Sequence, residues 1–96
     1  MQIKSVNHKG LKAMIAGKSP KGIDAGSVKK IARQLAALQA ADSIHTVETV
    51  PGWHLEEKTG PMKGTWTLWV TGNFRLTFRL ESPKGPIIDL WYGDYH

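Results

Sequence analysis

The chain closes on Gly93-Asp94-Tyr95-His96, directly after an apolar run that predicts a strand. A histidine in the last position carries its own α-carboxylate beside the imidazole. That negative charge favours the protonated ring, so we expect it to raise the pKa of His96 above the ordinary histidine value. A protonated imidazole suits general acid catalysis near neutral pH. His96 is therefore a candidate general acid, and the alternative is a disordered tail.

Other kinds of catalytic motif are missing from the sequence. His8, His45 and His54 are scattered without the spacing of metal ligands, so no metal site is predicted. The chain contains no glycine-rich phosphate loop, no His-Glu-x-x-His and no Gly-x-Ser-x-Gly. It also has no cysteine, which excludes a thiolate nucleophile and Cys-ligated zinc.

Two neighbouring segments, 64–70 and 74–80, predict a β-hairpin. Their apolar residues alternate, with Trp66, Leu68 and Val70 on the first segment and Phe74, Leu76 and Phe78 on the second. For both sets to face the core, Val70 must lie opposite Phe74, because a shift of one residue turns every side chain to the other face. This register predicts a three-residue loop, 71–73, with Gly72 or Asn73 at positive φ.

The same register predicts the other face of the hairpin. Trp69 then faces Arg75, and Thr65 faces Arg79. An aromatic ring beside arginines on an open sheet face is a reasonable platform for nucleic acid. The alternative is a cation–π pair that only decorates the surface.

The elements that must position these residues follow from the hydrophobic pattern. Helices are predicted over 8–16 and over a second segment whose apolar stripe is Val28, Ile31, Leu35 and Leu38, with Ser27 as its N-cap and Asp24 as the competitor. Strands are predicted over 2–6, 53–58 and 87–92, with a connector over 42–50 and a turn over 59–61. Helices followed by an antiparallel sheet indicate the α+β class.

Composition bounds the class of protein. The 96 residues suit one domain, 1–96, and the 41% hydrophobic and 22% charged residues indicate a globular chain. Thirteen Lys and Arg against eight Asp and Glu give a net charge of +5, which favours an anionic partner such as nucleic acid. No signal peptide and no apolar run of membrane-spanning length is visible, so we expect a cytoplasmic protein and no membrane partner.

Several motifs together resemble one family, the HigB toxins of bacterial type II toxin–antitoxin systems, within the RelE/ParE superfamily. They are Ile3-Lys4-Ser5, His8 to Lys12, Leu35 to Leu38, Pro51-Gly52-Trp53, Lys63-Gly64, Trp66, Gly72 to Arg79 and the ending Asp94-Tyr95-His96. The resemblance covers nearly the whole chain.

The resemblance implies a RelE-like fold, with two N-terminal helices packed on an antiparallel-rich sheet. It implies metal-independent cleavage of mRNA on the ribosome without a cofactor, in which the 2′-hydroxyl attacks the adjacent phosphate and leaves a cyclic phosphate. It also implies a cognate antitoxin with a helix-turn-helix domain. The family's sheet arginine corresponds to Arg75, and its terminal pair corresponds to Tyr95 and His96.

One segment departs from the family pattern. Where HigB toxins carry His-Pro-Leu-Lys-Gly, this chain has Glu56-Glu57-Lys58-Thr59-Gly60. Glu56 can serve as general base, as a glutamate does in the related YoeB toxins, with His96 as acid and Arg75 as phosphate clamp.

Other residues offer alternatives for the same tasks. His54 can serve as base in place of Glu56, and Lys58 or Lys63 can supply the missing lysine's charge. Arg79 and Trp69 complete the expected RNA contacts. Two other readings stay open: a catalytically weakened toxin that only binds antitoxin or ribosome, and a ParE-like gyrase inhibitor. The presence of both Arg75 and His96 argues against the second.

Overall fold

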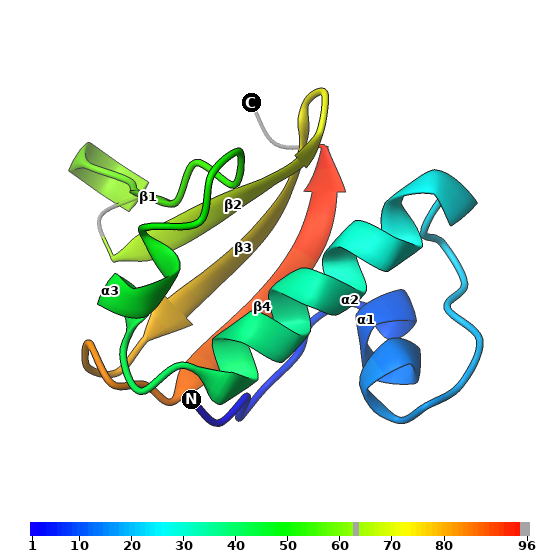
Figure 1. Ribbon diagram of the computed structural model, residues 1–96, viewed down its shortest axis with the longest axis horizontal. Helices are drawn as coiled ribbons and strands as arrows, with labels where there is room; N and C mark the ends of the chain where they lie inside the picture. Colours follow the sequence, from blue (N-terminus) through cyan, green and yellow to red (C-terminus); the bar gives the residue numbers. More distant parts are fainter. Residues whose placement is uncertain (63, 95–96) are drawn as a thin grey trace.

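The computed structural model describes residues 1–62 and 64–94, which form a sheet with helices on one side (Figure 1). The helices are α1 (Lys9–Ile15), α2 (Ala25–Ala40), α3 (Ile44–Val47) and the 3-10 turn η1 (Gly60–Met62). The strands are β1 (Glu56–Glu57), β2 (Thr65–Thr71), β3 (Phe74–Leu80) and β4 (Ile87–Asp94). All neighbouring strands pair antiparallel, in the order of the chain. The predicted α+β class is confirmed.

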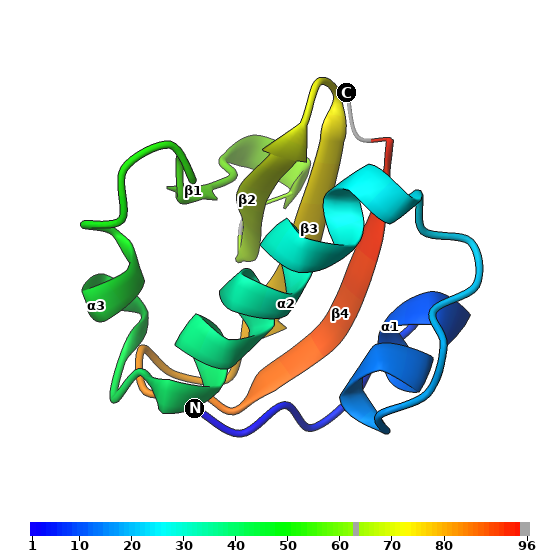
Figure 2. The same ribbon diagram turned by 45° about the vertical axis from the view of Figure 1, so that its right-hand side comes forward.

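The core lies between α2 and one face of the sheet, which we call the inner face. α2 crosses this face diagonally, and α1 lies beside α2 (Figures 1 and 2). Ile31, Leu35 and Leu38 of α2 are buried, as the predicted stripe requires. Burying each such side chain stabilises the fold by about 1.5–3 kcal/mol. In the residues that the structure describes, no helix is long and apolar enough to cross a membrane.

The start of α2 is tied to β4 by a small polar network. Asp24 is the N-cap residue, so the prediction of Ser27 is wrong. The buried Ser27 hydroxyl donates to one Asp24 carboxylate oxygen at 2.8 Å, and the Tyr92 hydroxyl donates to the other at 3.1 Å. The Ser27 bond, aided by the Tyr92 bond, lowers the pKa of Asp24 against the opposing effect of desolvation.

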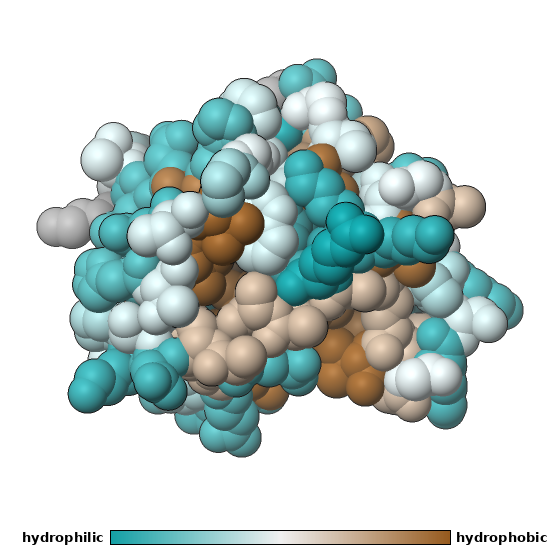
Figure 3. Space-filling model, viewed as in Figure 1, coloured by the Kyte–Doolittle hydropathy of each residue, from teal (hydrophilic) through white to brown (hydrophobic). Residues whose placement is uncertain are grey.

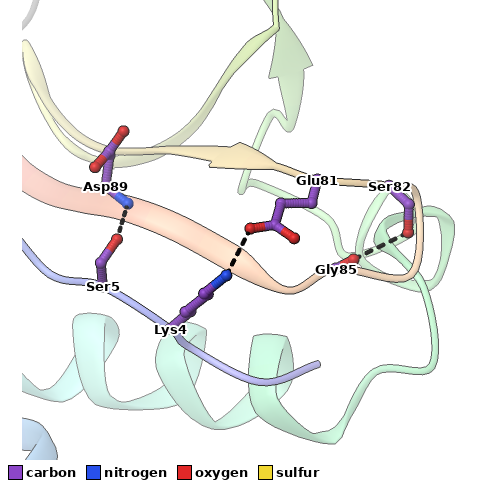
Figure 4. Close-up of polar contacts among 6 residues, drawn as sticks. All are labelled: Lys4, Ser5, Glu81, Ser82, Gly85 and Asp89. Carbon is purple, nitrogen blue, oxygen red and sulfur yellow. Dashed lines mark hydrogen bonds and ion pairs between the residues drawn. The ribbon is translucent and has the colours of Figure 1, made fainter.

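Residues 2–6, predicted as a strand, make only two isolated parallel bridges to β4, at Ile3 and Val6. Between the two bridges the Ser5 hydroxyl accepts the N–H of Asp89 at 2.8 Å (Figure 4). Asp89 has a φ of 55°, so β4 is irregular at this point. A regular ladder therefore cannot form. In the same segment, the Lys4 ammonium forms an ion pair with the Glu81 carboxylate at 3.0 Å.

Two other predicted segments also differ from the structure. The expected connector over 42–50 contains α3, which buries Ile44 and Val47. The expected strand over 53–58 is regular only at Glu56–Glu57, because His54 has a φ of 48° and interrupts the extended backbone. The expected turn over 59–61 falls at η1, Gly60–Met62.

The β2–β3 hairpin confirms most of the predicted register and corrects its end. Trp69 pairs with Arg75 and Thr65 pairs with Arg79, as expected. Thr71, not Val70, pairs with Phe74, because a β-bulge lies between Trp69 and Thr71. The loop is therefore Gly72-Asn73, with Gly72 at a φ of 49°. The bulge keeps Val70 buried, while Phe74 is 39% exposed and stacks on Tyr92.

Gln34 of α2 reaches the bulge from the inner face. Its amide nitrogen donates to the main-chain oxygen of Trp69 at 2.7 Å. The side chain is fully buried, and its Oε1 has no hydrogen-bond partner among the described residues. Gln34 thus satisfies a carbonyl that the irregular strand offers to the interior, where an unpaired oxygen is unfavourable.

Replacing Gln34 by methionine tests this contact. The variant keeps the shape of the side chain but leaves the Trp69 oxygen unpaired, so we expect the free energy of unfolding to fall by about 1–2 kcal/mol. Urea unfolding at neutral pH measures the change through its midpoint. Gln39→Met, the same substitution at an exposed position of α2, should leave the midpoint unchanged. An equal midpoint for Gln34→Met and the unsubstituted protein would contradict the assignment.

The Asp24 network predicts a pH dependence of stability. Because folding lowers the pKa of Asp24, its contribution is present above the unfolded-state pKa and is lost as the pH falls through the folded-state value. Asp24→Asn should therefore lose stability at pH 7 but flatten the decline toward acid pH. Unfolding curves between pH 7 and pH 2 measure this, and Asp42→Asn, an exposed carboxylate after α2, is the control. Parallel pH profiles for the unsubstituted protein and Asp24→Asn would refute the prediction.

Candidate active site

The candidate residues that the structure describes gather on the face of the sheet opposite α2, which we call the outer face. Directly opposed residues of antiparallel neighbours project from the same face, and every second residue along a strand does so too. The register therefore sets three parallel rows on the outer face. The first row is Trp69, Arg75 and Gly93, the second is Glu56, Thr67, Thr77 and Trp91, and the third is Thr65 and Arg79. The N–H of Lys58 donates to the carbonyl of Thr65 at 2.8 Å, which adds Lys58 to the third row.

Arg75 is a positioned cation at the centre of the first row. Its Nη1 donates to the carbonyls of Gly72 at 2.6 Å and of Phe74 at 3.0 Å. The guanidinium carbon lies 4.4 Å from the ring centroid of Trp69. A guanidinium has three further N–H groups on Nη2 and Nε, in a planar fork that matches phosphate oxygens. Arg75 is therefore held ready to bind a phosphate rather than free to move with its long side chain.

Trp69 stands between two planar side chains. The His54 ring lies 4.1 Å from it, centroid to centroid, and comes from the β1 side, whereas Arg75 comes from β3. The main chain of Trp69 is also fixed, because its N–H donates to the Trp53 carbonyl at 2.8 Å and its oxygen accepts from Gln34. The sequence prediction placed Trp69 beside Arg75 on the outer face, and the structure confirms that placement.

His54 has a backbone conformation that few residues adopt. Its φ of 48° lies in the left-handed region, which strains a non-glycine residue. The carbonyl of the preceding residue, Trp53, is anchored on Trp69, and the imidazole is exposed against the Trp69 indole. The strain thus turns an exposed imidazole toward the row that holds Arg75.

Glu56 lies on the outer face but farther from Arg75. It is two strands away and one row along, so standard sheet spacings put the two Cα atoms roughly 12 Å apart. Its carboxylate is exposed and lies 3.4 Å from Nζ of Lys58. Lys58 and Glu56 therefore form a local ion pair at the edge of the sheet, next to the first row.

The remaining predicted residues divide into two groups. Arg79 is exposed in the third row, and its Nη2 lies close to Gly64, at the start of β2. Lys63, Tyr95 and His96 lie outside the described residues, so their expected roles stay predictions. Within the described residues, no three His, Asp or Glu side chains form a group that could hold a metal ion.

Two further residues of the site are not predicted by the sequence patterns above, Trp91 and Gln34, and Trp91 lies on the outer face beside Thr77. Its signal is the phase of alternation along β4: Leu90 and Tyr92 are buried on the inner face, so the residue between them must face outward. The signal for Gln34 is a polar residue three positions after Ile31 and four before Leu38, on the buried stripe of α2.

The helix side of the molecule differs from the outer face. Figure 3, viewed from that side, shows apolar surface over the C-terminal half of α2 and hydrophilic surface over its N-terminal half. An open hollow of about 180 Å³ lies between α1 and α2, and its lining includes Met14, Ile15 and Ala32. None of the described candidate residues lines it, so the candidate site and this hollow belong to different surfaces.

Comparison with known proteins shows the family of this chain. A family model described as the RelE-like toxin of type II toxin–antitoxin system HigB matches residues 4–96. Endoribonuclease HigB from Proteus vulgaris is 32% identical over 94 residues, which span 98% of this chain and 99% of that protein. This chain belongs to the HigB family of RelE-like toxins of type II toxin–antitoxin systems.

Proposed function

We propose that this protein is an endoribonuclease toxin that cuts mRNA on the ribosome. The observation that carries the proposal is the fixed guanidinium of Arg75, which lies over Trp69 and is bonded to the carbonyls of Gly72 and Phe74 on the outer face. The name of the Proteus vulgaris relative and the net charge of +5 support the same conclusion. A basic protein gains affinity for RNA through its phosphates.

The proposed reaction is attack of a 2′-hydroxyl on the adjacent phosphate. The new O–P bond forms as the bond to the 5′-oxygen breaks, which leaves a 2′,3′-cyclic phosphate and a 5′-hydroxyl. Negative charge grows on the non-bridging oxygens during this step, and we assign its stabilisation to Arg75. A base must take the 2′-proton, and an acid must protonate the leaving oxygen. We assign the acid to His96, with Tyr95 beside it.

Two residues can act as the base, and the geometry favours His54. Its imidazole touches the same indole as Arg75, whereas Glu56 is one row away and paired with Lys58. The base and the phosphate clamp must reach the same nucleotide together. The residue that shares a contact with Arg75 is therefore the better candidate base. We assign to Lys58, Lys63 and Arg79 the supply of positive charge for the RNA backbone.

The family implies an antitoxin partner for this toxin. We propose that the antitoxin carries a helix-turn-helix domain, and that the toxin acts in the cytoplasm, where its ribosomal substrate is. The function itself is tested by mapping the 5′ ends of mRNA after expression with and without translation. Translation-dependent ends within the A-site codon support the proposal. Growth arrest without new ends would instead support a gyrase inhibitor or a weakened toxin.

Removing the clamp should abolish cleavage while the fold survives. Arg75→Ala leaves the developing phosphate charge without its cation, and loss of one such group lowers the rate by about 10²–10³. Single-turnover cleavage of mRNA in programmed ribosomes measures the rate, and the urea midpoint checks the fold. Arg33→Ala, the same change on the exposed side of α2, should cut at the rate of the unsubstituted protein. Equal rates for the two variants would exclude Arg75 as the clamp.

The pH dependence of cleavage should separate the two candidate bases. With a base and an acid in the reaction, the single-turnover rate should follow a bell-shaped curve. His54→Gln should lower the rate about 10²–10⁴-fold and remove the acidic limb, because the base no longer titrates. Glu56→Gln should keep the limb and most of the rate. The reverse pattern would assign the base to Glu56, and His96→Gln should remove the basic limb in either case.

A further inference from the structure

We propose that Trp91 forms a nucleobase subsite beside Arg75, on the outer face of β4. This inference rests on the proposed function, because it places a base of the RNA next to the phosphate that Arg75 holds. The occupant is an unpaired base of single-stranded RNA, since only an unstacked base can offer its face to an aromatic side chain.

The indole of Trp91 lies flat across Gly93. A Cβ added at Gly93 would overlap Cη2 and Cζ2 of the indole and would come within 3.0 Å of Cζ3. The φ of Gly93 is not in the left-handed region, so the backbone itself does not require glycine there. Glycine at position 93 instead leaves the space that the Trp91 indole occupies. One face of the indole therefore covers the strand, and the half-buried ring turns its other face away from the sheet.

This position puts the indole beside the phosphate clamp. Gly93 is the register partner of Arg75, and Arg75 is the partner of Trp69. Trp91 belongs to the next row along β4, but its ring reaches back over Gly93 into the row of Arg75. The two indoles therefore flank Arg75 on its two sides, about two strand spacings or roughly 10 Å apart.

Trp91 is better placed than Trp69 to receive a base. The Trp69 indole already contacts both the His54 ring and the Arg75 guanidinium, so a base that stacks on it competes with these two contacts. Trp69 thus acts as a rigid support for the two polar groups. The outward face of Trp91 offers aromatic surface without such competition. A nucleotide with its phosphate on Arg75 can therefore lay a neighbouring base on Trp91.

A purely structural role for Trp91 predicts different behaviour. Aromatic rings that cover a glycine on a neighbouring position are known to support sheets. In that case loss of the ring lowers stability, and any loss of activity is the same for every RNA. In the subsite, loss of the ring weakens binding only when the RNA carries the base that stacks on it.

The test uses three variants of the full chain. Trp91→Ala removes the ring, Trp91→Phe keeps an aromatic surface, and Gly93→Ala leaves the ring but forces it off the strand. Gly26→Ala is the matched control, because a Cβ at Gly26 of α2 meets only an ordinary contact, at 3.7 Å from Asp24. Urea midpoints show whether each variant is folded at the temperature of the assay.

Binding is measured on ribosomes programmed with mRNA that carries a 2′-deoxy nucleotide at the cleavage position, so that no cutting occurs. Loss of one base stack should weaken binding of Trp91→Ala about 5- to 150-fold. Gly93→Ala should show a loss of the same order, Trp91→Phe a smaller loss, and Gly26→Ala none. Single-turnover cleavage of ordinary mRNA should show the same loss in half-saturating concentration, with a smaller change in maximal rate.

The decisive arm replaces the nucleotide on either side of the target phosphate by an abasic one. Unsubstituted protein should lose affinity for one of these two RNAs, and on that RNA Trp91→Ala should bind no more weakly than the unsubstituted protein. Equal effects of Trp91→Ala on intact and both abasic RNAs would overturn the subsite and leave a structural role. If the unsubstituted protein does not cleave ordinary mRNA, the proposed function fails, and the binding arm still decides for or against the subsite.

Discussion

The outer face depends on the way in which the main chain of Trp69 is fixed. Its N–H is bound by the Trp53 carbonyl from the β1 side, and its oxygen is bound by Gln34 from the helix side. These two bonds join the segment before β1, the bulged strand β2 and helix α2 at one residue. The indole then sets the positions of His54 and Arg75. The site is thus held by main-chain bonds that reach through the sheet, and not only by contacts on its surface.

The bulge at Val70 explains why a side chain of α2 can bind the main chain of β2. In a regular ladder the oxygen of a strand residue points to a neighbouring strand, so a side chain below the sheet cannot reach it. A bulge disturbs the ladder locally and redirects groups on the bulged strand. Here it leaves the Trp69 oxygen to the buried amide of Gln34, while Val70 stays in the core. Helix α2 therefore influences a face of the sheet that it does not cover.

Features with a strict hydrophobic period could be predicted from the sequence. The stripe of α2 and the alternation along β2 and β3 gave the α+β class, and the pairing of Trp69 with Arg75 followed from the register. The apolar character of Phe74 did not predict its partly exposed position, because its ring stacks on Tyr92 at the edge of the core. The hydrophobic pattern also cannot predict hydrogen bonds between distant segments, such as those of Ser5 with Asp89 and of Gln34 with Trp69. The outward position of Trp91 could be inferred from β4, but its reach over Gly93 could not.

The attachment of residues 2–6 to β4 has a consequence for the order of folding. Lys4 and Ser5 contact residues 77 and 84 positions later, and Ile87 and Leu90 bridge back to Ile3 and Val6 (Figures 2 and 4). Contacts of such long sequence separation form late, because the loop between them must close first. During synthesis, β3 lacks a neighbour on one side and the first segment lacks any strand to join until β4 has been made. A nascent chain that stops short of β4 also lacks Gly93, the register partner of Arg75, so the outer face is complete only when β4 has emerged.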